Sequence, residues 1–123
     1  MSLAYQIDAG RRLVITTASG VLSDADLIAH QQCLVQDAQF DGGYGQLVDP
    51  TDIRGGQVTF ETLMSIAARS PWPETTRRAL VVNGGIVTSI ADLYRSELGA
   101  AAPNVKLFQS RDDALDWLEL RGS

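Results

Sequence analysis

The chain has 123 residues, of which 45% are hydrophobic and 20% are charged. This length fits one domain with its own hydrophobic core, and the composition is typical of a globular protein and too apolar for a disordered one. The formal net charge of −5 argues against nucleic acid as a partner, because phosphate binding needs a clustered positive field.

Two further features of the composition narrow the class of protein. Cys33 is the only cysteine, which excludes an intrachain disulfide and a CxxC metal or redox site. No apolar run approaches the ~18 residues of a membrane span, and the first residues lack a signal-peptide pattern, so we expect a cytoplasmic protein. The basic pairs Arg11–Arg12 and Arg77–Arg78 adjoin predicted strands, and we expect both to be solvated strand ends.

The first part of the chain predicts a β-hairpin followed by a helix. Tyr5–Ile7 alternates in polarity, Leu13–Thr17 is rich in β-branched residues, and Gly20 is expected to end the second strand. Ser23 or Asp24 then caps a helix. Its expected apolar stripe is Leu27, Ile28, Leu34, Val35 and Ala38.

The middle of the chain predicts strand, helix and strand. Gln46–Asp49 is a short strand that Pro50 is expected to end, and Thr59 caps the next helix. Ser70–Pro73 stops this helix, because proline cannot continue it. Ala79–Val82 is wholly apolar, as expected for a strand with both faces covered. The expected stripe of the helix is Phe60, Leu63, Met64 and Ala67.

The last part of the chain repeats this alternation. Asn83-Gly84-Gly85 turns into a third helix, Val105–Phe108 is a strand, and Ser110 begins the last helix. The third helix is expected to bury Ile86, Ile90 and Leu93, and the last one Ala114, Leu115, Leu118 and Trp117. A hairpin followed by alternating helices and strands favours parallel strands with right-handed crossovers. We therefore predict one α/β domain over residues 1–123, a mixed sheet of about five strands with about four helices.

Several phrases of the sequence resemble the bacterial SpoIIAA-like family, relatives of the STAS domain. The matching phrases are Gly20-Val21-Leu22-Ser23, His30-Gln31, Gln46-Leu47-Val48-Asp49, Ala68-Arg69-Ser70-Pro71, Pro103-Asn104-Val105 and Ala114-Leu115-Asp116-Trp117-Leu118. The resemblance implies a SpoIIAA-like fold. It also implies a non-enzymatic switch that binds a protein partner and is phosphorylated just past the strand Gln46–Asp49, where Thr51 is the nearest hydroxyl.

Polar groups that follow the predicted strands are candidate ligand- or partner-binding residues, because ligands in open parallel sheets bind past the carboxyl ends of strands. Asp49, Asp52 and Arg54 follow one strand. The carboxylates could also hold Mg²⁺, but acids in loops more often cap helices or stay solvated, so no metal or cofactor is predicted. Asn83, Gly84 and Gly85 could bind an anion at a helix start, although a tight turn explains the glycines equally well.

Four other residues have more than one interpretation. His30, the only imidazole, lies at the edge of a helical stripe, and Cys33 lies mid-helix without activating neighbours, so a nucleophilic pair is not expected. Gln31 lies within the stripe and must find hydrogen-bond partners if buried. Trp72 lies between two prolines, and its side chain is either folded back over the domain as a lid or left exposed as a contact for a partner.

A wide apolar arc on the third helix predicts a homodimer. Val87, Tyr94 and Leu98 lie beside its expected core stripe, and a second copy would cover the excess. The preferred function is therefore a non-enzymatic regulatory or protein-interaction module. The alternative is a carrier of a small apolar, lipid-like ligand of the SEC14-like type. An enzyme using His30, Asp49 or Asp52 is the third hypothesis.

Overall fold

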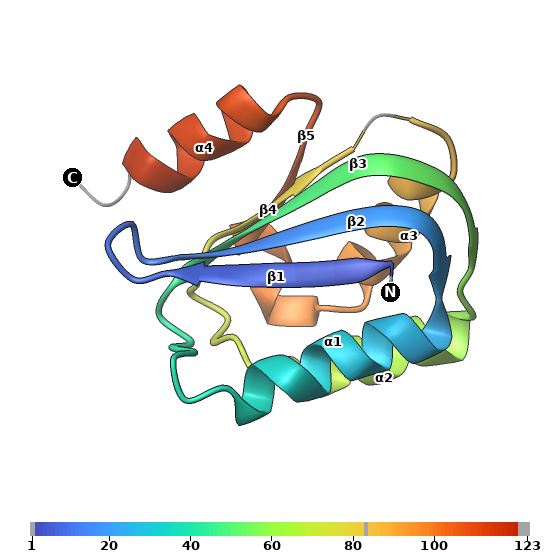
Figure 1. Ribbon diagram of the computed structural model, residues 1–123, viewed down its shortest axis with the longest axis horizontal. Helices are drawn as coiled ribbons and strands as arrows, with labels where there is room; N and C mark the ends of the chain where they lie inside the picture. The colour runs from blue at the N-terminus through green and yellow to red at the C-terminus, as the bar shows by residue number, and fades with distance from the viewer. Residues whose placement is uncertain (1, 83, 121–123) are drawn as a thin grey trace.

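A five-stranded mixed sheet forms the centre of the structure, with helices on both of its faces (Figure 1). The structure, a computed structural model, describes residues 2–82 and 84–120, and the side chains of Thr51 and Leu120 fall outside this description. The elements in chain order are β1 (Leu3–Asp8), β2 (Leu13–Ser23), α1 (Asp24–Gln36), β3 (Gly45–Gln57), α2 (Phe60–Ala68), β4 (Arg78–Val81), α3 (Gly85–Ser96), the short 3-10 helix η1 (Gly99–Asn104), β5 (Val105–Phe108) and α4 (Arg111–Leu120).

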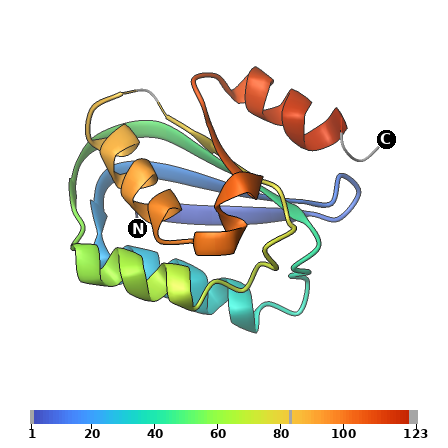
Figure 2. The same cartoon turned by 180° about the vertical axis from the view of Figure 1, so that it is seen from behind.

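The strand order in the sheet follows the order of the chain, β1-β2-β3-β4-β5. β1 and β2 form an antiparallel hairpin, and the other neighbours pair in parallel. Right-handed crossovers that all advance in one direction place their helices on one face of the sheet. Accordingly α1, α2 and α3 cover one face, and α4 covers the other (Figures 1 and 2). The predicted α/β architecture is confirmed.

Alternation along the strands builds a separate hydrophobic core on each face, because successive side chains point to opposite sides of a sheet. On the α4 face the buried cluster consists of Leu13, Leu47, Ala79, Val81, Ala114 and Leu118. On the other face the neighbouring positions Val14, Leu80 and Val82 pack toward the helices α1 to α3. Both faces of β4 are buried, as its apolar sequence predicts.

Side-chain caps begin three of the helices, as the sequence predicts. The hydroxyl of Ser23 accepts a hydrogen bond from the amide of Asp26 at 3.2 Å, and Thr59 accepts from Thr62 at 3.2 Å. Ser110 accepts in the same way from Asp113 at 3.1 Å. These contacts satisfy amide groups that have no partner within the first helical turn.

Two expected strand ends are wrong. β2 continues through Gly20, whose φ of 71° accompanies shifts in the pairing register, and it ends only at Ser23. β3 continues through Pro50 to Gln57. β4 pairs only with the start of β3, so β3 beyond Val48 is an edge strand. Proline is tolerated in an edge strand because its missing N–H is not needed for pairing on the open side. The extended ends of β2 and β3 bend together toward α1 and α2 (Figure 1).

The expected apolar stripes of the first three helices are partly wrong. The exposed members, at 40–59% exposure, are Ile28 and Val35 of α1, Phe60 and Met64 of α2, and Ile86 and Leu93 of α3, and Ala38 lies exposed beyond α1. On α3 the expected residue Ile90 does pack inward, and it is joined by Val87, Ala91, Tyr94 and, just beyond the helix, Leu98. Polar residues on the inner faces, such as His30 and Tyr94, displace the stripe that hydrophobicity alone indicates. The stripe of α4 is confirmed.

Candidate functional site

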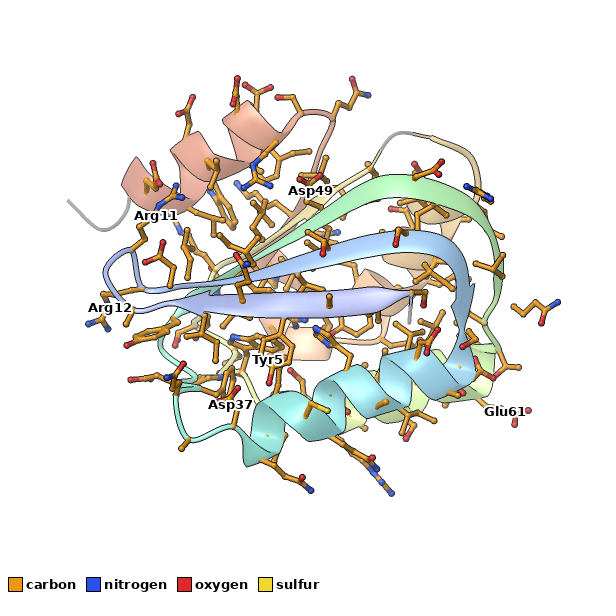
Figure 3. All side chains as sticks on the ribbon, in the orientation of Figure 1. Tyr5, Arg11, Arg12, Asp37, Asp49 and Glu61 are labelled. Atoms are coloured by element: carbon orange, nitrogen blue, oxygen red, sulfur yellow. The ribbon has the colours of Figure 1, made fainter. Side chains whose placement is uncertain are left out.

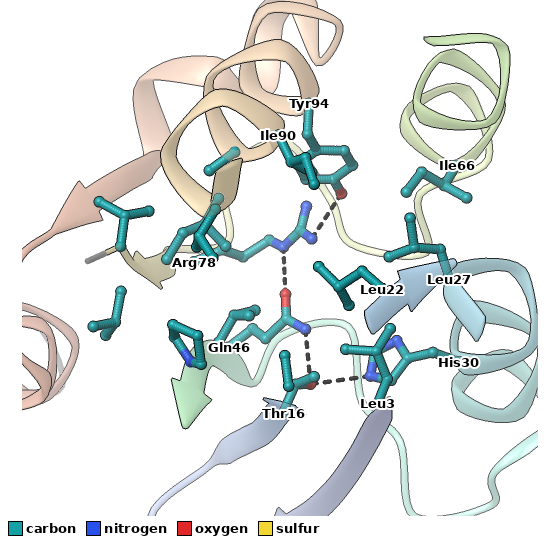
Figure 4. A pocket seen from close by; sticks show the side chains of 18 of the residues that line it. Leu3, Thr16, Leu22, Leu27, His30, Gln46, Ile66, Arg78, Ile90 and Tyr94 are labelled. Carbon is teal, nitrogen blue, oxygen red and sulfur yellow. Dashed lines mark hydrogen bonds between the residues drawn. The ribbon is translucent and has the colours of Figure 1, made fainter. Parts of the chain in front are cut away.

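A cavity of about 140 Å³ lies between the sheet and the three helices α1, α2 and α3 (Figure 4). Its walls are mainly aliphatic, with contributions from every strand except β5. The apolar residues include Leu3, Leu22, Leu27, Val48, Ile53, Leu63, Ile66, Leu80, Val87 and Ile90. Since protein interiors are normally close-packed, a space of this size in the middle of a small domain is the main candidate for a binding site.

A chain of polar side chains crosses the cavity wall from α1 to α3 (Figure 4). Nε2 of His30 lies 3.0 Å from the hydroxyl of Thr16, which also accepts a hydrogen bond from Nε2 of Gln46 at 3.1 Å. Nε of Arg78 donates to Oε1 of Gln46 at 2.9 Å. Nη2 of Arg78 donates to the hydroxyl of Tyr94 at 2.7 Å. One network therefore connects five elements, α1, β2, β3, β4 and α3.

Arg78 sets the direction of this network. A guanidinium can only donate hydrogen bonds, so the group of Gln46 that faces it must be the amide oxygen. The amide nitrogen of Gln46 then points to Thr16. Because the Tyr94 hydroxyl accepts from Arg78, its own proton is available for another acceptor, and no described residue provides one.

Arg78 is a buried cation without a carboxylate partner. Its exposure is 5%, and arginine stays charged in proteins. All aspartate and glutamate side chains belong to the described part of the chain, and none of them forms an ion pair with Arg78. Its two hydrogen-bond acceptors, Gln46 and Tyr94, are neutral, and Nη1 has no acceptor among the described residues. The expectation that Arg78 is a solvated strand end is wrong.

Trp72 is folded back onto this site. It is buried, its indole nitrogen donates to the carbonyl of Tyr44 at 3.3 Å, and Phe40 packs edge-on against its ring. The guanidinium carbon of Arg78 lies 4.3 Å from the centre of the Trp72 ring and 5.3 Å from that of Tyr94. The faces of both rings are negative, so they partly compensate the buried charge.

His30 is held neutral in the cavity wall. Burial, and secondly the positive charge of Arg78, lower the pKa of His30 from 6.5 to about 4. Its ring also meets the ring of Tyr5 edge-on, with the centres 5.6 Å apart. Neutral at physiological pH, His30 leaves Arg78 as the only charged side chain among the described residues that line the cavity.

The acidic candidate residues do not join the cavity. Asp49 lies on the α4 side of the sheet (Figure 3), where it accepts a hydrogen bond from Nη1 of Arg111 at 2.6 Å. Asp52 and Arg54 form an exposed ion pair at 3.2 Å within β3. These residues lie in the strand and not in a loop past its end, which corrects the expected position of Thr51 as well. The side chain of Thr51 lies outside the described residues.

The expected anion site before α3 has the geometry of a turn. Gly84 and Gly85 have φ values of 92° and 63°, which side-chain-bearing residues rarely adopt, and the amide of Gly84 donates to the hydroxyl of Thr88 at 3.1 Å. Asn83 lies outside the described residues. Among the candidates, the cavity thus brings together Trp72 and Tyr94 only.

Other polar groups occupy structural positions. Gln31 donates to the carbonyl of Ile66 at 2.8 Å, so its amide finds a partner on α2. Cys33 is exposed on α1. Within residues 2–82 and 84–120, no three His, Cys, Asp or Glu side chains gather closely enough to hold a metal ion. No helix in the same part of the chain is long and apolar enough to cross a membrane.

The fold is that of an α/β domain of the SpoIIAA-like type. A solved structure from Shewanella loihica PV-4, an uncharacterized protein of the DUF3478 family with a SpoIIAA-like fold, superposes on it with a TM-score of 0.65. The alignment covers 95% of this chain and 93% of that chain, at 19% sequence identity. No protein-family model matches the sequence, and no curated protein matches it. The comparison confirms the SpoIIAA-like fold that the sequence resemblance implies.

Proposed function

We propose that this chain is a non-enzymatic binding domain that holds a small, largely apolar ligand between its sheet and the helices α1 to α3. The observation that carries this proposal is the cavity itself, about 140 Å³ in volume and lined mainly by aliphatic side chains. It favours the carrier interpretation of the sequence over the regulatory one.

The volume of the cavity limits the size of the ligand. Sites for drug-sized molecules measure roughly 300–1,000 Å³, whereas an apolar cavity of roughly 150 Å³ is large enough for benzene. A ligand with a body of about six carbons therefore fits the observed space. A long acyl chain is larger than this cavity.

The arrangement of polar groups supports binding without catalysis. Hydrolytic and acid–base sites combine a nucleophile or base with a second group that orients it. In the described structure His30 contacts a threonine and not a carboxylate, and Asp49 lies on the opposite side of the sheet from the cavity. The polar network is suited to orienting a ligand.

Methyl-resolved NMR titration with two probes of similar size, benzyl alcohol and benzoate, tests the proposal. We expect saturable shifts, with either probe, of the cavity methyl groups of Leu27, Leu80 and Ile90. The variant Ile66→Trp places a large side chain in the cavity and should abolish the shifts. Met64→Trp, on the exposed side of the same helix, should preserve them. Absence of saturable shifts with both probes, or shifts that persist in Ile66→Trp, would contradict the proposal.

A regulatory homodimer is the second candidate function. Its support is the exposed apolar surface of α1, α2 and α3, which includes Ile86 and Leu93 seven residues apart on α3. A second copy of the chain is the proposed occupant, because twofold homo-oligomers are the commonest assemblies. Light scattering at high micromolar concentration should then give the mass of a dimer, and Leu93→Lys should reduce it. A monomer at that concentration would rule this candidate out. Phosphorylation of Thr51 stays a prediction.

A further inference from the structure

The charge balance of the cavity indicates the chemical class of its ligand. A buried ion is costly unless an opposite charge and hydrogen bonds compensate it. Arg78 has hydrogen bonds to neutral groups and contacts with two aromatic rings, but no carboxylate of the described chain reaches it. The folded domain thus encloses one positive charge beside an apolar space.

The donors around Arg78 match a carboxylate. Nη1 of Arg78 has no acceptor among the described residues, and the hydroxyl proton of Tyr94, 2.7 Å from Nη2, has none either. The guanidinium and the adjacent hydroxyl are thus two neighbouring donors, and a carboxylate has two oxygens that can accept from them. Trp72 lies over one face of the guanidinium, and Arg78 also lines the cavity, so an anion can reach it from the cavity.

We propose that the cavity binds a small monocarboxylate, whose carboxylate pairs with Arg78 and accepts the proton of the Tyr94 hydroxyl, while its apolar body of about six carbons contacts the aliphatic walls. A single negative charge balances the single cation that lines the cavity. A dianion such as a phosphate ester would leave a second charge uncompensated in an apolar site. This inference rests on the proposed function, because it names the ligand class of the same cavity.

Calorimetric or NMR titration at pH 7, where benzoate is ionised, compares benzoate with its neutral relative benzyl alcohol. Wild-type protein should bind benzoate at least about tenfold more tightly, because hydrogen bonds to charged groups are stronger than neutral ones. In Arg78→Met this preference should disappear while benzyl alcohol still binds. In Tyr94→Phe it should decrease by several fold.

The adjacent arginine provides a matched control. Arg77 precedes Arg78 directly but lies on the α4 face, where its guanidinium stacks on Trp117 at 4.9 Å and donates to the carbonyl of that residue. Arg77→Met removes the same charge at nearly the same place in the chain. It should leave the preference for benzoate unchanged, so equal losses in both variants would overturn the proposal.

A second test of the inference measures the pKa of His30 in the wild-type protein and needs no variant. His30 is the only histidine, so its ring signals are unambiguous. Arg78 lowers the pKa of His30, and a bound carboxylate should offset that charge and raise the pKa, whereas benzyl alcohol should not.

The outcomes separate this inference from the proposed function. Equal affinity of the wild type for both probes would overturn the carboxylate inference and leave the cavity as a neutral binding site. Failure of both probes to bind would overturn the proposed function and the inference with it. Tight benzoate binding that Arg78→Met does not weaken would overturn the inference alone, because the anion would then lie elsewhere.

Discussion

The two faces of the sheet differ in what their covering helices enclose. On the α4 face the buried cluster consists of aliphatic side chains with aromatic rings packed against it, and Leu47 and Ala114 are fully buried. Under α1, α2 and α3 the same strands contribute Thr16, Gln46 and Arg78 beside a cavity. Because β3 and β4 supply both faces through alternate residues, the difference arises from single positions. The comparison teaches that the α4 face is packed as an apolar core, whereas the face under α1, α2 and α3 contains the candidate site.

The largest expected effect comes from truncating one leucine on each face. Leu47→Ala should cost about 3–4 kcal/mol of unfolding free energy, because a fully packed site loses both transfer energy and contacts. Leu80→Ala, on the cavity side of the neighbouring strand, should cost about 1 kcal/mol less, because Leu80 already borders unfilled space. Urea unfolding measures both. Equal costs would mean that the two faces are packed alike.

The next largest effect is the loss of folding stability at acid pH that the buried His30 on the cavity face should cause. The pKa of His30 is about 4 in the folded protein against an ordinary value of 6.5, so the unfolded state binds more protons between these values. The free energy of unfolding should therefore decrease by up to roughly 3 kcal/mol as the pH falls from 6.5 to about 4.

The variant His30→Gln isolates this contribution, because the carboxylates of the chain titrate alike in both proteins. Urea unfolding at a series of pH values should show a smaller decline for the variant between pH 6.5 and 4. Parallel stability curves for the two proteins would contradict the burial of a neutral imidazole.

A smaller effect is expected from removing the contact between Arg78 and Tyr94. Tyr94→Phe should cost about 1–2 kcal/mol, because it leaves a guanidinium N–H without its acceptor in a buried place. In an Arg78→Met background the same change should cost almost nothing. A double-mutant cycle from urea unfolding gives the coupling, and an equal cost in both backgrounds would show that the hydroxyl acts independently of Arg78.

The smallest effect is expected on the α4 face. Asp49 and Arg111 form a partly exposed ion pair, and such pairs contribute less than about 1 kcal/mol. Asp49→Asn should lower stability by this amount at low salt and by less at high salt. A larger or salt-independent loss would indicate that Asp49 has a role beyond holding α4.

Much of the fold can be predicted from sequence because its signals are local. The capping hydroxyls of Ser23, Thr59 and Ser110 and the apolar strands mark where helices and strands begin. Element ends were harder to predict. Pro50 stops a strand only where both neighbours pair, and that depends on the length of β4.

The sequence indicates little of the candidate site, although one signal points to it. A strand buried on both faces has no solvated side, so one of Arg77 and Arg78 must point toward each covered face. Arg78 lies on the same face of β4 as Leu80, and this face borders the cavity. Which neighbours it meets there depends on how α1 and α3 pack, since Thr16, His30 and Tyr94 are far apart in the sequence. Local patterns do not contain that information.

The sequential strand order also has a consequence for how the domain folds. Each strand pairs with the strand just before it in the chain, so the sheet can grow one neighbour at a time, and each parallel pairing must first close a crossover connection that contains a helix. α3 comes after β4 in the chain, so Tyr94 reaches Arg78 only when this helix packs onto the sheet. Burial of the Arg78 guanidinium is therefore complete only when α3 is in place.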